Sequence, residues 1–594
     1  MFEMPIGNQC AEGAGFKPTP TKPMFEMPIG NQCAEGAGFK PTPTKPVHGL
    51  TEIVRAWQRN YYEHMRIALI NPGQLSDAGE DQFAGRMDTV FFRLTPFSKT
   101  YFGIPLALPT LAGATPSKHS VRIIDEMVET IDFDAPCDVV GISAMTCKAT
   151  RGYQIAVEFR KRGVPVIMGG IHASMCPDEV AAHVDCVVVG EADAIWAEIL
   201  HDLEQGQLKP RYCGALPDAA SIALPRHDLT PHEHYFAYLL QTTRGCPRDC
   251  SFCTVTAMNG RTLRKKTPEQ VMAEVRSVLR IPNQVRPVIF DIEASKRERR
   301  LASGTIFFVD DNFAIDRQHA LSICRALKDF QDANDVHINW FTQTDFRVGF
   351  DDELLSAMKD AGCMNIFVGF ESLSPQTLKA MKKNVNSPER YAECIQGIES
   401  HGIAVTASVI VGADSDTLAT EDEMAEFVLR NRLFYFFPNI LTPYPGTRLA
   451  QELQAAQRIL IRAPELYNVR NVVFQPKQMT PRQLRELYVS LCQKVLGIDN
   501  LHRSALEKLK RPNRYYLTRR WRLLACLGFS WVLVALALKR TITLRELVKL
   551  LWWAPRMIIA DGSLVAMGLV ANLVSFCTFS RSEQRRLGAV PGLK

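Results

Sequence analysis

Three cysteines lie within eight residues near the middle of this 594-residue chain. They occur in Arg244-Gly-Cys246-Pro-Arg-Asp-Cys250-Ser-Phe-Cys253, a C-x3-C-x2-C spacing that places three thiols on one loop. Three thiolates can bind three irons of a [4Fe–4S] cluster and leave the fourth iron open to another molecule. A structural zinc site needs a fourth Cys or His, and the next twenty residues contain neither. Zinc binding and simple electron transfer are the weaker alternatives.

The cysteine loop follows one strand in a long alternation of predicted strands and helices. In the first half, strands are expected at 66–71, 121–124, 138–145, 164–170 and 186–190, with helices near 150–162 and 194–203. In the second half, strands are expected at 238–243, 305–309, 337–342, 365–370, 405–411 and 435–441, with helices that include 268–279 and 351–361. Apolar strands separated by helices predict parallel sheets covered by helices. The fold class is therefore α/β, with a doubly wound, Rossmann-like sheet followed by a partial (β/α)6 TIM barrel.

The pattern divides the chain into five predicted regions. They are a disordered leader at 1–64, the Rossmann-like domain at 65–205, a linker at 206–236, the barrel at 237–455, and a helical C-terminal tail at 456–594. Residues 1–23 recur identically as 24–46, and this Gly-, Pro- and Thr-rich repeat cannot bury a core. The repeat is therefore interpreted as disordered, either a gene-start duplication or a cloning scar. Residues 281–303 are predicted to form a basic surface insertion.

The C-terminal tail is basic and locally apolar. Residues 501–594 carry 17 Lys and Arg against 4 Asp and Glu, whereas the other 500 residues carry 52 against 59. Two uncharged runs, 523–538 and 562–579, are shorter than the ~20 residues that span a bilayer. Basic residues before, between and after the runs favour shallow contact with a membrane surface over spanning. A short transmembrane hairpin and a buried helical cap on the barrel are the alternatives.

The predicted location is the cytoplasm, at the inner face of the membrane. The sixteen cysteines show no disulfide framework, and the first 23 residues lack the basic and apolar segments of a secretory signal. No nucleic-acid partner is expected.

The chain resembles the radical SAM superfamily, in which a three-cysteine loop directly follows the first barrel strand. The resemblance implies that S-adenosylmethionine (SAM) binds the open iron and that one electron, from a donor such as flavodoxin or ferredoxin, releases a 5′-deoxyadenosyl radical. It also implies that Phe252 lies by the adenine and that acids at the end of the second strand bind the methionyl amino group. The residues implied in SAM binding are Phe252, Asp310, Asp311, Asn312, Glu371 (ribose), Gly412 (adenine) and Tyr444. Helix capping is the alternative for 310–312, and a plain turn for the loop at 443–447.

Small residues follow the strands of the first predicted sheet, in the loops Gly141-Ile-Ser143, Gly169-Gly170-Ile-His172-Ala-Ser174 and Gly190-Glu191-Ala-Asp193. Ligands of such sheets bind beyond the carboxyl ends of the strands, where small residues let a flat ligand approach. With the barrel, this region resembles the cobalamin-binding domain of class B radical SAM enzymes over residues 65–455. The resemblance implies that cobalamin contacts Gly141, Ser143, Gly169, Gly170, His172, Ser174, Gly190 and Glu191, with loop capping as the alternative for His172.

One feature of that family is missing. The usual D-x-H-x-x-G pattern does not occur after the early strands, and the loop that starts at Pro72 has no His. The usual lower axial histidine of the cobalt is therefore absent.

The paired domains imply methylation of an unactivated carbon. In such enzymes the deoxyadenosyl radical removes a substrate hydrogen, methylcobalamin supplies the methyl group, and a second SAM restores it. The tail favours a lipophilic substrate such as a hopanoid, an isoprenoid or a tetrapyrrole. The alternatives are an oxidative cyclase or rearranging enzyme of the same fold, and a cobalamin- or redox-sensing iron–sulfur protein. A methylthiotransferase would need a second three-cysteine cluster, and the upstream cysteines are scattered at Cys137, Cys147, Cys176, Cys186 and Cys213.

Overall fold

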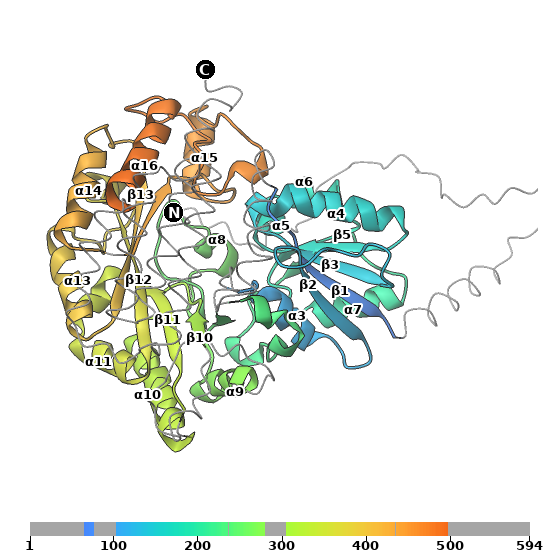
Figure 1. The fold of residues 1–594 in the computed structure, drawn as a ribbon. Coiled ribbons are helices and arrows are strands. Elements are labelled where there is room, and N and C mark those ends of the chain that lie inside the picture. Colours follow the sequence, from blue (N-terminus) through green and yellow to red (C-terminus); the bar gives the residue numbers. More distant parts are fainter. Residues whose placement is uncertain are drawn as a thin grey trace, which may run out of the picture.

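A computed structural model of the chain describes residues 64–75, 103–235, 237–279, 305–334, 336–433 and 435–496. These residues form two α/β units that lie against each other (Figure 1). The predictions for the leader, for the 281–303 insertion and for the two apolar runs of the tail lie outside the described residues. Within the described residues, no helix has both the length and the apolar character needed to cross a membrane.

The first unit is a parallel sheet of six strands in the order β2-β1-β3-β4-β5-β6. Its strands are β1 (Arg66–Asn71), β2 (Ser120–Asp125), β3 (Val139–Ser143), β4 (Val166–Gly169), β5 (Cys186–Gly190) and β6 (Arg211–Gly214). Its helices are α3 (Ala107–Ala114), α4 (Ala149–Lys161), α5 (Ile171–Met175), α6 (Pro177–Ala181) and α7 (Trp196–Glu204). The predicted doubly wound sheet is thus confirmed.

Both faces of this first sheet are covered. On one face, alternate strand residues such as Leu69 and Val188 pack with α3 and α7. On the other face, residues such as Val140 and Val187 pack with α4 and the short helices α5 and α6. The near-continuous apolar strands predicted this arrangement, because a strand buried on both faces has no solvent-facing positions.

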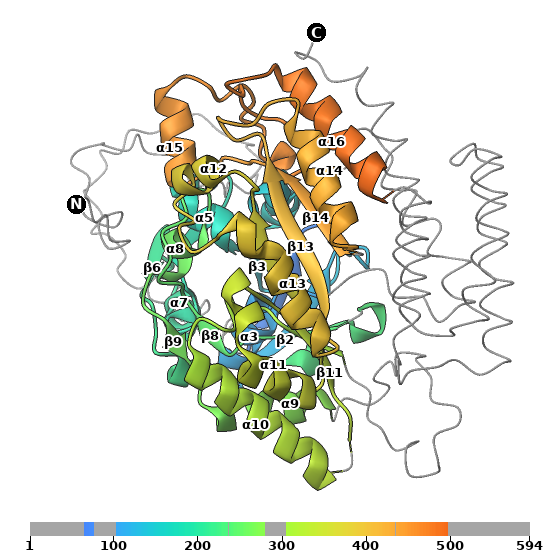
Figure 2. The same ribbon diagram turned by 90° about the vertical axis from the view of Figure 1, so that its left-hand side faces the viewer.

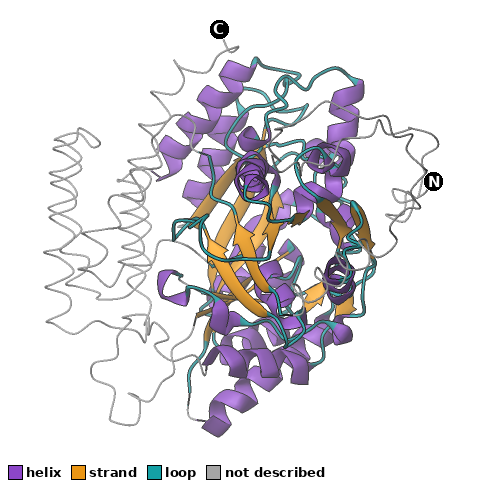
Figure 3. Cartoon of the chain, turned by 90° about the vertical axis from the view of Figure 1, so that its right-hand side faces the viewer, coloured by secondary structure: helices purple, strands orange, loops and turns teal. Residues whose placement is uncertain are grey.

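The second unit is a curved parallel sheet in the order β14-β13-β12-β11-β10-β7. Its strands are β7 (Tyr238–Leu240), β10 (Thr305–Phe308), β11 (Asn339–Thr344), β12 (Cys363–Glu371), β13 (Ala404–Val411) and β14 (Tyr435–Ile440). The helices with it are α9 (Pro268–Leu279), α10 (Arg317–Asn334), α11 (Asp352–Asp360), α12 (Pro375–Ala380), α13 (Tyr391–Ser400), α14 (Thr420–Arg430), α15 (Arg448–Ala455) and α16 (Pro481–Leu496). Figures 2 and 3 show these helices outside the curved strands, as in the predicted partial (β/α)6 barrel.

Most of the core of the barrel lies on the outer face of its sheet. Outward strand residues such as Phe308, Trp340 and Val368 are buried against the helices. The residues between them, such as Phe341 and Phe367, face inward and are only partly buried. The inner face of the barrel is therefore the less covered of its two faces.

The prediction of a linker at 206–236 is partly wrong. It contains β6, which pairs in parallel with β5, and Tyr235, whose hydroxyl donates a 2.6 Å hydrogen bond to Asp125. The short four-residue strand lacks a long apolar run, so its partner in the sheet decides its conformation. A small antiparallel pair, β8 (Thr243–Arg244) with β9 (Arg264–Lys265), then carries the chain into and out of the cysteine loop.

Candidate active site

The cysteine loop lies between β8 and the short helix α8 (Val255–Asn259). Cys246, Cys250 and Cys253 are all partly buried free thiols. Gly245 has φ of +89°, and a Cβ there would meet the carbonyl oxygen of Thr262 at 2.4 Å, so only glycine fits at the entry to the loop. Burial raises the pKa of the Cys253 thiol to about 12, so metal binding must displace its proton.

Charged side chains hold this loop to the barrel. Arg248 lies 3.1 Å from Asp345, which follows β11. Asp249 accepts hydrogen bonds from Arg448, Lys382 and Arg261. The loop is therefore fixed at several points around the thiols before any cluster is bound.

The thiol arrangement fits a cluster better than a single metal ion. One group of three His, Cys, Asp or Glu ligand atoms lies within 4.8 Å of one another among the described residues, and it is His172, Cys176 and Glu179. The three loop cysteines do not form such a group. A tetrahedral zinc ion with bonds of about 2.3 Å would draw its sulfurs to within about 4 Å of one another.

In the acidic segment after β10, two of the residues predicted to bind SAM have other partners. Asp310 is fully buried, and its carboxylate accepts hydrogen bonds from the backbone N–H and hydroxyl groups of Thr242 and Thr243. Asn312 exchanges hydrogen bonds with Asp345 through both ends of its amide. These two side chains therefore hold the loops around the site, because their polar atoms are already occupied.

The predicted role of Asp311, as the acid for the methionyl amino group, stays a prediction. One of its oxygens accepts hydrogen bonds from the N–H of Gly245 and from the side chain of Asn259. Phe252 packs against the barrel core, and its predicted place beside the adenine stays a prediction.

Glu371 ends β12 with φ of +62°, a conformation that non-glycine residues rarely adopt. Its carboxylate lies 2.8 Å from the ammonium of Lys383, and both side chains are largely buried. Burial acts to lower the pKa of Lys383, but Glu371 and the neighbouring Cys250 outweigh it and raise that pKa above its ordinary value. Lys383, which the sequence analysis missed, is therefore a buried cation beside the cluster loop.

The predicted adenine contact at Gly412 is not supported. Its N–H donates to the carboxylate of Asp416 at 2.8 Å, and a Cβ on it would meet Leu484 of α16. Gly412 is needed for its φ of +102° and for packing against α16. Tyr444 lies in the loop after β14, whose Gly446 packs directly on Met175 of α5, so this loop contacts the first unit.

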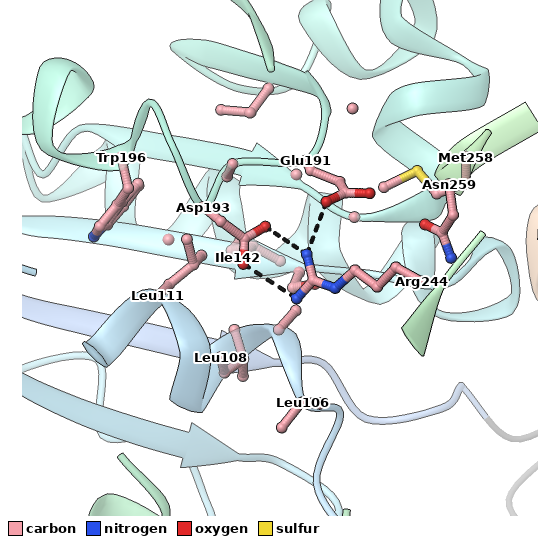
Figure 4. Close-up of a pocket in the computed structure, with 18 of the residues that line it drawn as sticks. Leu106, Leu108, Leu111, Ile142, Glu191, Asp193, Trp196, Arg244, Met258 and Asn259 are labelled. Carbon is pink, nitrogen blue, oxygen red and sulfur yellow. Dashed lines mark hydrogen bonds and ion pairs between the residues drawn. The ribbon is translucent and has the colours of Figure 1, made fainter. Parts of the chain in front are cut away.

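The ends of β3, β4 and β5 form one cavity of about 220 Å³ (Figure 4). Six predicted cobalamin contacts line it, namely Gly141, Ser143, Gly169, Gly170, Gly190 and Glu191. Leu108, Leu111 and Trp196 supply an apolar wall, and Arg244 and Asn259 close the side toward the barrel. A mostly apolar slot with backbone groups and few polar side chains fits the flat base that ends the nucleotide tail of cobalamin.

His172 and Ser174 do not line this cavity. The hydroxyl of Ser174 donates to the carbonyl of Gly170 and accepts from the N–H of Gly190, so it joins two of the glycine loops. His172 is buried, and its Nε2 lies 2.8 Å from the hydroxyl of Tyr153. Neither side chain lines the slot, and that of His172 bonds a tyrosine of α4, so its loop-capping alternative also stays a prediction.

Comparisons with known proteins agree with this arrangement. Residues 99–200 match the B12-binding domain family and residues 240–428 match the radical SAM superfamily. The chain is 32% identical over 387 residues to the bacteriochlorophyllide d C-8(2)-methyltransferase of Chlorobaculum tepidum, across 63% of this chain and 82% of that one. The chain belongs to the B12-dependent radical SAM methylases.

Other relatives and solved structures share the same architecture. The hopanoid C-2 methylase of Rhodopseudomonas palustris is 29% identical, across 60% of this chain and 65% of that one. TsrM from Kitasatospora setae, solved with cobalamin and a [4Fe–4S] cluster, superposes with a TM-score of 0.54 over 88% of this chain and all of that one, at 14% identity. The cobalamin-dependent radical enzyme OxsB superposes with a TM-score of 0.55 over 89% of this chain and 81% of that one.

This B12-dependent radical SAM methylase is a C-methyltransferase that uses a [4Fe–4S] cluster, SAM and cobalamin. The thiol loop and the slot between the glycine loops are the parts of this chain that fit the cluster and the cobalamin. When bound, these cofactors supply a carbon-centred radical and a methyl donor, which lets the enzyme methylate a carbon that is no nucleophile.

Proposed function

We propose that this enzyme methylates a flat, largely apolar polycyclic substrate that binds at the inner face of the barrel. The observation that carries the proposal is an apolar girdle on that face. The girdle consists of Leu239, Phe307, Phe341, Phe367 and Phe437, one each from β7, β10, β11, β12 and β14.

The girdle has the geometry of a platform for flat molecules. Leu239 pairs with Phe307, and Phe307 pairs with Phe341, across adjacent strands. The rings of Phe307 and Phe341 stack 4.5 Å apart with an angle of 14° between them. Phe367 meets Phe437 edge to face at 5.9 Å, and Phe437 is 49% exposed. Aromatic faces of this kind contribute both apolar area and stacking energy to a planar ligand.

Charge supports the same conclusion. Apart from Glu371 at the end of β12, which pairs with Lys383, the other inward positions of β11 to β14 hold uncharged side chains, among them Asn339, Gln343, Asn365, Thr406 and Asn439. A charged group placed against those uncharged positions would lose its hydration without gaining an ion pair. The amides and hydroxyls suit the few polar groups at the edge of a largely apolar molecule.

The relatives act on molecules of this chemical class. One is named for bacteriochlorophyllide d, a planar tetrapyrrole, and another for hopanoids, which are flat polycyclic hydrocarbons. The shared chemistry is a rigid apolar ring system, and the stacked phenylalanines favour the planar tetrapyrrole.

The residues of this chain have distinct parts in such a reaction. The girdle holds the ring system and excludes water from the reacting carbon. Lys383 and Glu371 offer a buried ion pair to the polar groups of SAM. Asp310 keeps the strand that carries the cysteine loop in place.

Anaerobic turnover with reconstituted enzyme tests the proposal. A bacteriochlorophyllide and a hopanoid are offered separately, with mass spectrometry for methylated product and for S-adenosylhomocysteine and 5′-deoxyadenosine. We expect methylation of the tetrapyrrole with both SAM products formed. Methylation of the hopanoid alone would show that the substrate is a saturated polycyclic hydrocarbon rather than a planar tetrapyrrole. Turnover of a charged, water-soluble substrate with neither ring system accepted would overturn the proposal.

A variant pair ties the result to the girdle. Phe437→Asp places a carboxylate on the platform, and we expect KM for the substrate to rise about tenfold or more. Leu429→Asp, a half-exposed apolar residue of α14, is the matched control. Deoxyadenosine formation without substrate is expected to be the same in both variants.

We further propose that the C-terminal region docks the enzyme on the inner face of the cytoplasmic membrane, where lipophilic substrates gather. The support is the basic, apolar composition of residues 501–594. Sedimentation with anionic vesicles, compared with neutral vesicles and with a chain ending near Pro512, is the test. Equal recovery of both chains in the supernatant would contradict it.

A flavodoxin or ferredoxin is the proposed electron donor.

A further inference from the structure

Four charged residues join the cysteine loop to the cobalamin slot. They are Glu191 and Asp193 after β5, Arg244 in β8 and Arg264 in β9, called here the charged quartet. Arg244 and Arg264 stand opposite each other in the β8–β9 pair. Both reach across to the same carboxylate, Glu191, in the first unit.

The contacts within the quartet are directional. Arg244 donates to Glu191 at 2.8 Å, and it donates to both oxygens of Asp193 at 2.9 and 3.2 Å. Arg264 donates to both oxygens of Glu191, to the carbonyl of Pro217 and to the carbonyl of Asn259. Planar guanidinium groups that bind carboxylates through two nitrogens fix orientation as well as distance.

The quartet is buried and electrically balanced. The exposed fractions of its side chains are 12% for Arg244 and Asp193, 9% for Arg264 and 3% for Glu191. Two cations face two carboxylates, so no member is left with an uncompensated charge. Removing one partner from such a group leaves a buried charge unpaired, so the geometry of the group depends on all four members.

Each end of the quartet is attached to a cofactor site. Arg244 directly precedes Gly245 and Cys246, the first thiol of the loop. Glu191 and Asp193 line the cavity between the glycine loops, and Figure 4 shows Arg244 lying between them. A Cβ on Gly214 would meet the carbonyl oxygen of Glu191 at 1.8 Å, so β6 packs tightly against the backbone of this loop.

We propose that the charged quartet is a positioning device that sets the distance and orientation between the [4Fe–4S] cluster and cobalamin. Its members are positioning residues, because they act through the cysteine loop and the glycine loops. The reaction needs hydrogen abstraction and methyl delivery at one carbon, and a displacement of about 1 Å between reacting groups can cost about 10²-fold in rate.

Asp193→Asn tests the proposal in the holoenzyme, because it removes one charge and keeps the size of the side chain. The readout is the magnetic interaction between the reduced cluster and cob(II)alamin, which are both paramagnetic, measured by electron paramagnetic resonance. Asp178→Asn removes an exposed carboxylate that pairs with Arg211 in the same unit, and it is the matched control.

Iron and cobalamin contents identify the fraction of Asp193→Asn molecules that hold both cofactors, and the interaction is read in that fraction. Its magnetic interaction is expected to be weaker and more widely distributed, whereas that of the control stays sharp. An unchanged interaction would overturn the proposal. Loss of one cofactor, with a normal interaction in the molecules that keep both, would also overturn it, because the residue would then only retain a cofactor.

Arg244→Lys is the second variant if Asp193→Asn does not fold. It keeps the positive charge but loses the two-nitrogen fork. The same weakening of the magnetic interaction is expected, and a sharp, wild-type interaction in Arg244→Lys would contradict a role in positioning.

Discussion

The two six-stranded sheets share an all-parallel topology, yet they bury their strands differently. In the first sheet, all five residues of β5 are buried, and separate core clusters cover its two faces. In the barrel, buried and partly buried residues alternate along β11 and along much of β12, and most of the core lies on the outer face. A sheet covered on both faces binds ligands at its strand ends, whereas a sheet covered on one face offers the other to a substrate.

The difference explains how one chain serves two cofactors and a substrate. The first sheet offers a closed slot between glycine loops, which suits a cofactor that stays bound. The barrel offers a wider apolar face, which suits a substrate that must enter and leave. The charged quartet joins the two units at the strand ends, where both cofactor sites lie.

The largest expected effect comes from a variant that removes the cluster from the barrel and leaves the cobalamin slot of the first unit intact. Cys250→Ser removes one of three cluster ligands, so iron content and 5′-deoxyadenosine formation should fall below detection. Cobalamin content should stay unchanged, because the slot is built from the first unit. Iron analysis measures the cluster content, and the absorbance spectrum of cobalamin measures the cobalamin content.

Cys137→Ser, at a partly buried free thiol of the first unit, is the control and should keep both cofactors. Parallel loss of cobalamin and iron in Cys250→Ser would mean that the two sites form only together.

Neighbouring residues in the two sheets provide a direct stability test. Val187 and Val188 point to opposite faces of the first sheet and both are buried, so asparagine at either position should cost about 3–5 kcal/mol of unfolding free energy. Phe436 is buried, whereas Phe437 is 49% exposed. Asparagine should cost several-fold more at 436 than at 437, where we expect about 1 kcal/mol or less.

Chemical denaturation of the four single variants measures these free energies. Equal costs at Phe436 and Phe437 would show that the inner face of the barrel is a packed core, and the comparison between the sheets would fail.

The cobalamin slot can be filled without touching the barrel. Gly169 lines the cavity, and a Cβ there has no neighbour closer than 3.6 Å, so Gly169→Val should fold. The added methyl groups should lower cobalamin affinity about 10- to 100-fold by occupying the slot, with deoxyadenosine formation retained.

Cobalamin titration of the cluster-loaded protein measures that affinity. Val157→Leu, on the exposed side of α4, should bind like the wild type. Wild-type affinity in Gly169→Val would show that the tail of cobalamin lies elsewhere.

The smallest expected effect concerns the buried ion pair of the barrel. Lys383→Met leaves Glu371 without its cation, and SAM affinity should fall about tenfold, the change in one charge-assisted contact. Lys379→Met, at an exposed lysine of α12, is the matched control. Anaerobic calorimetry gives the dissociation constant of SAM for each variant. Equal SAM affinities in the two variants would show that Lys383 does not contact SAM.

Much of the architecture follows from local sequence pattern. Strand β1 and helix α9 begin and end at the predicted residues, because each carries a strong apolar period and clear flanking signals. The glycine loops were also predicted, and they do form one cavity. Strand β6 was missed because its four residues have no period of their own.

The predicted roles of single side chains were less successful. Asp310 carries the residue type expected of a ligand-binding acid, but its partners are Thr242 and Thr243, more than sixty residues away in the chain. Lys383 lies twelve residues beyond Glu371, in a stretch with no recognised pattern. A sequence motif shows that an acid or base is present, but not which neighbour occupies it.

The sequence by itself determined the cysteine loop, the two α/β units and the small residues at the strand ends, because each depends on residues close together in the chain. Only the tertiary structure decided that the first sheet is covered on both faces and that the barrel carries the apolar girdle on its inner face. It also decided that Arg244 and Arg264 meet Glu191, which lies 53 and 73 residues away. The physical reason is that burial and ion pairing depend on which segments pack together, and local pattern does not specify those partners.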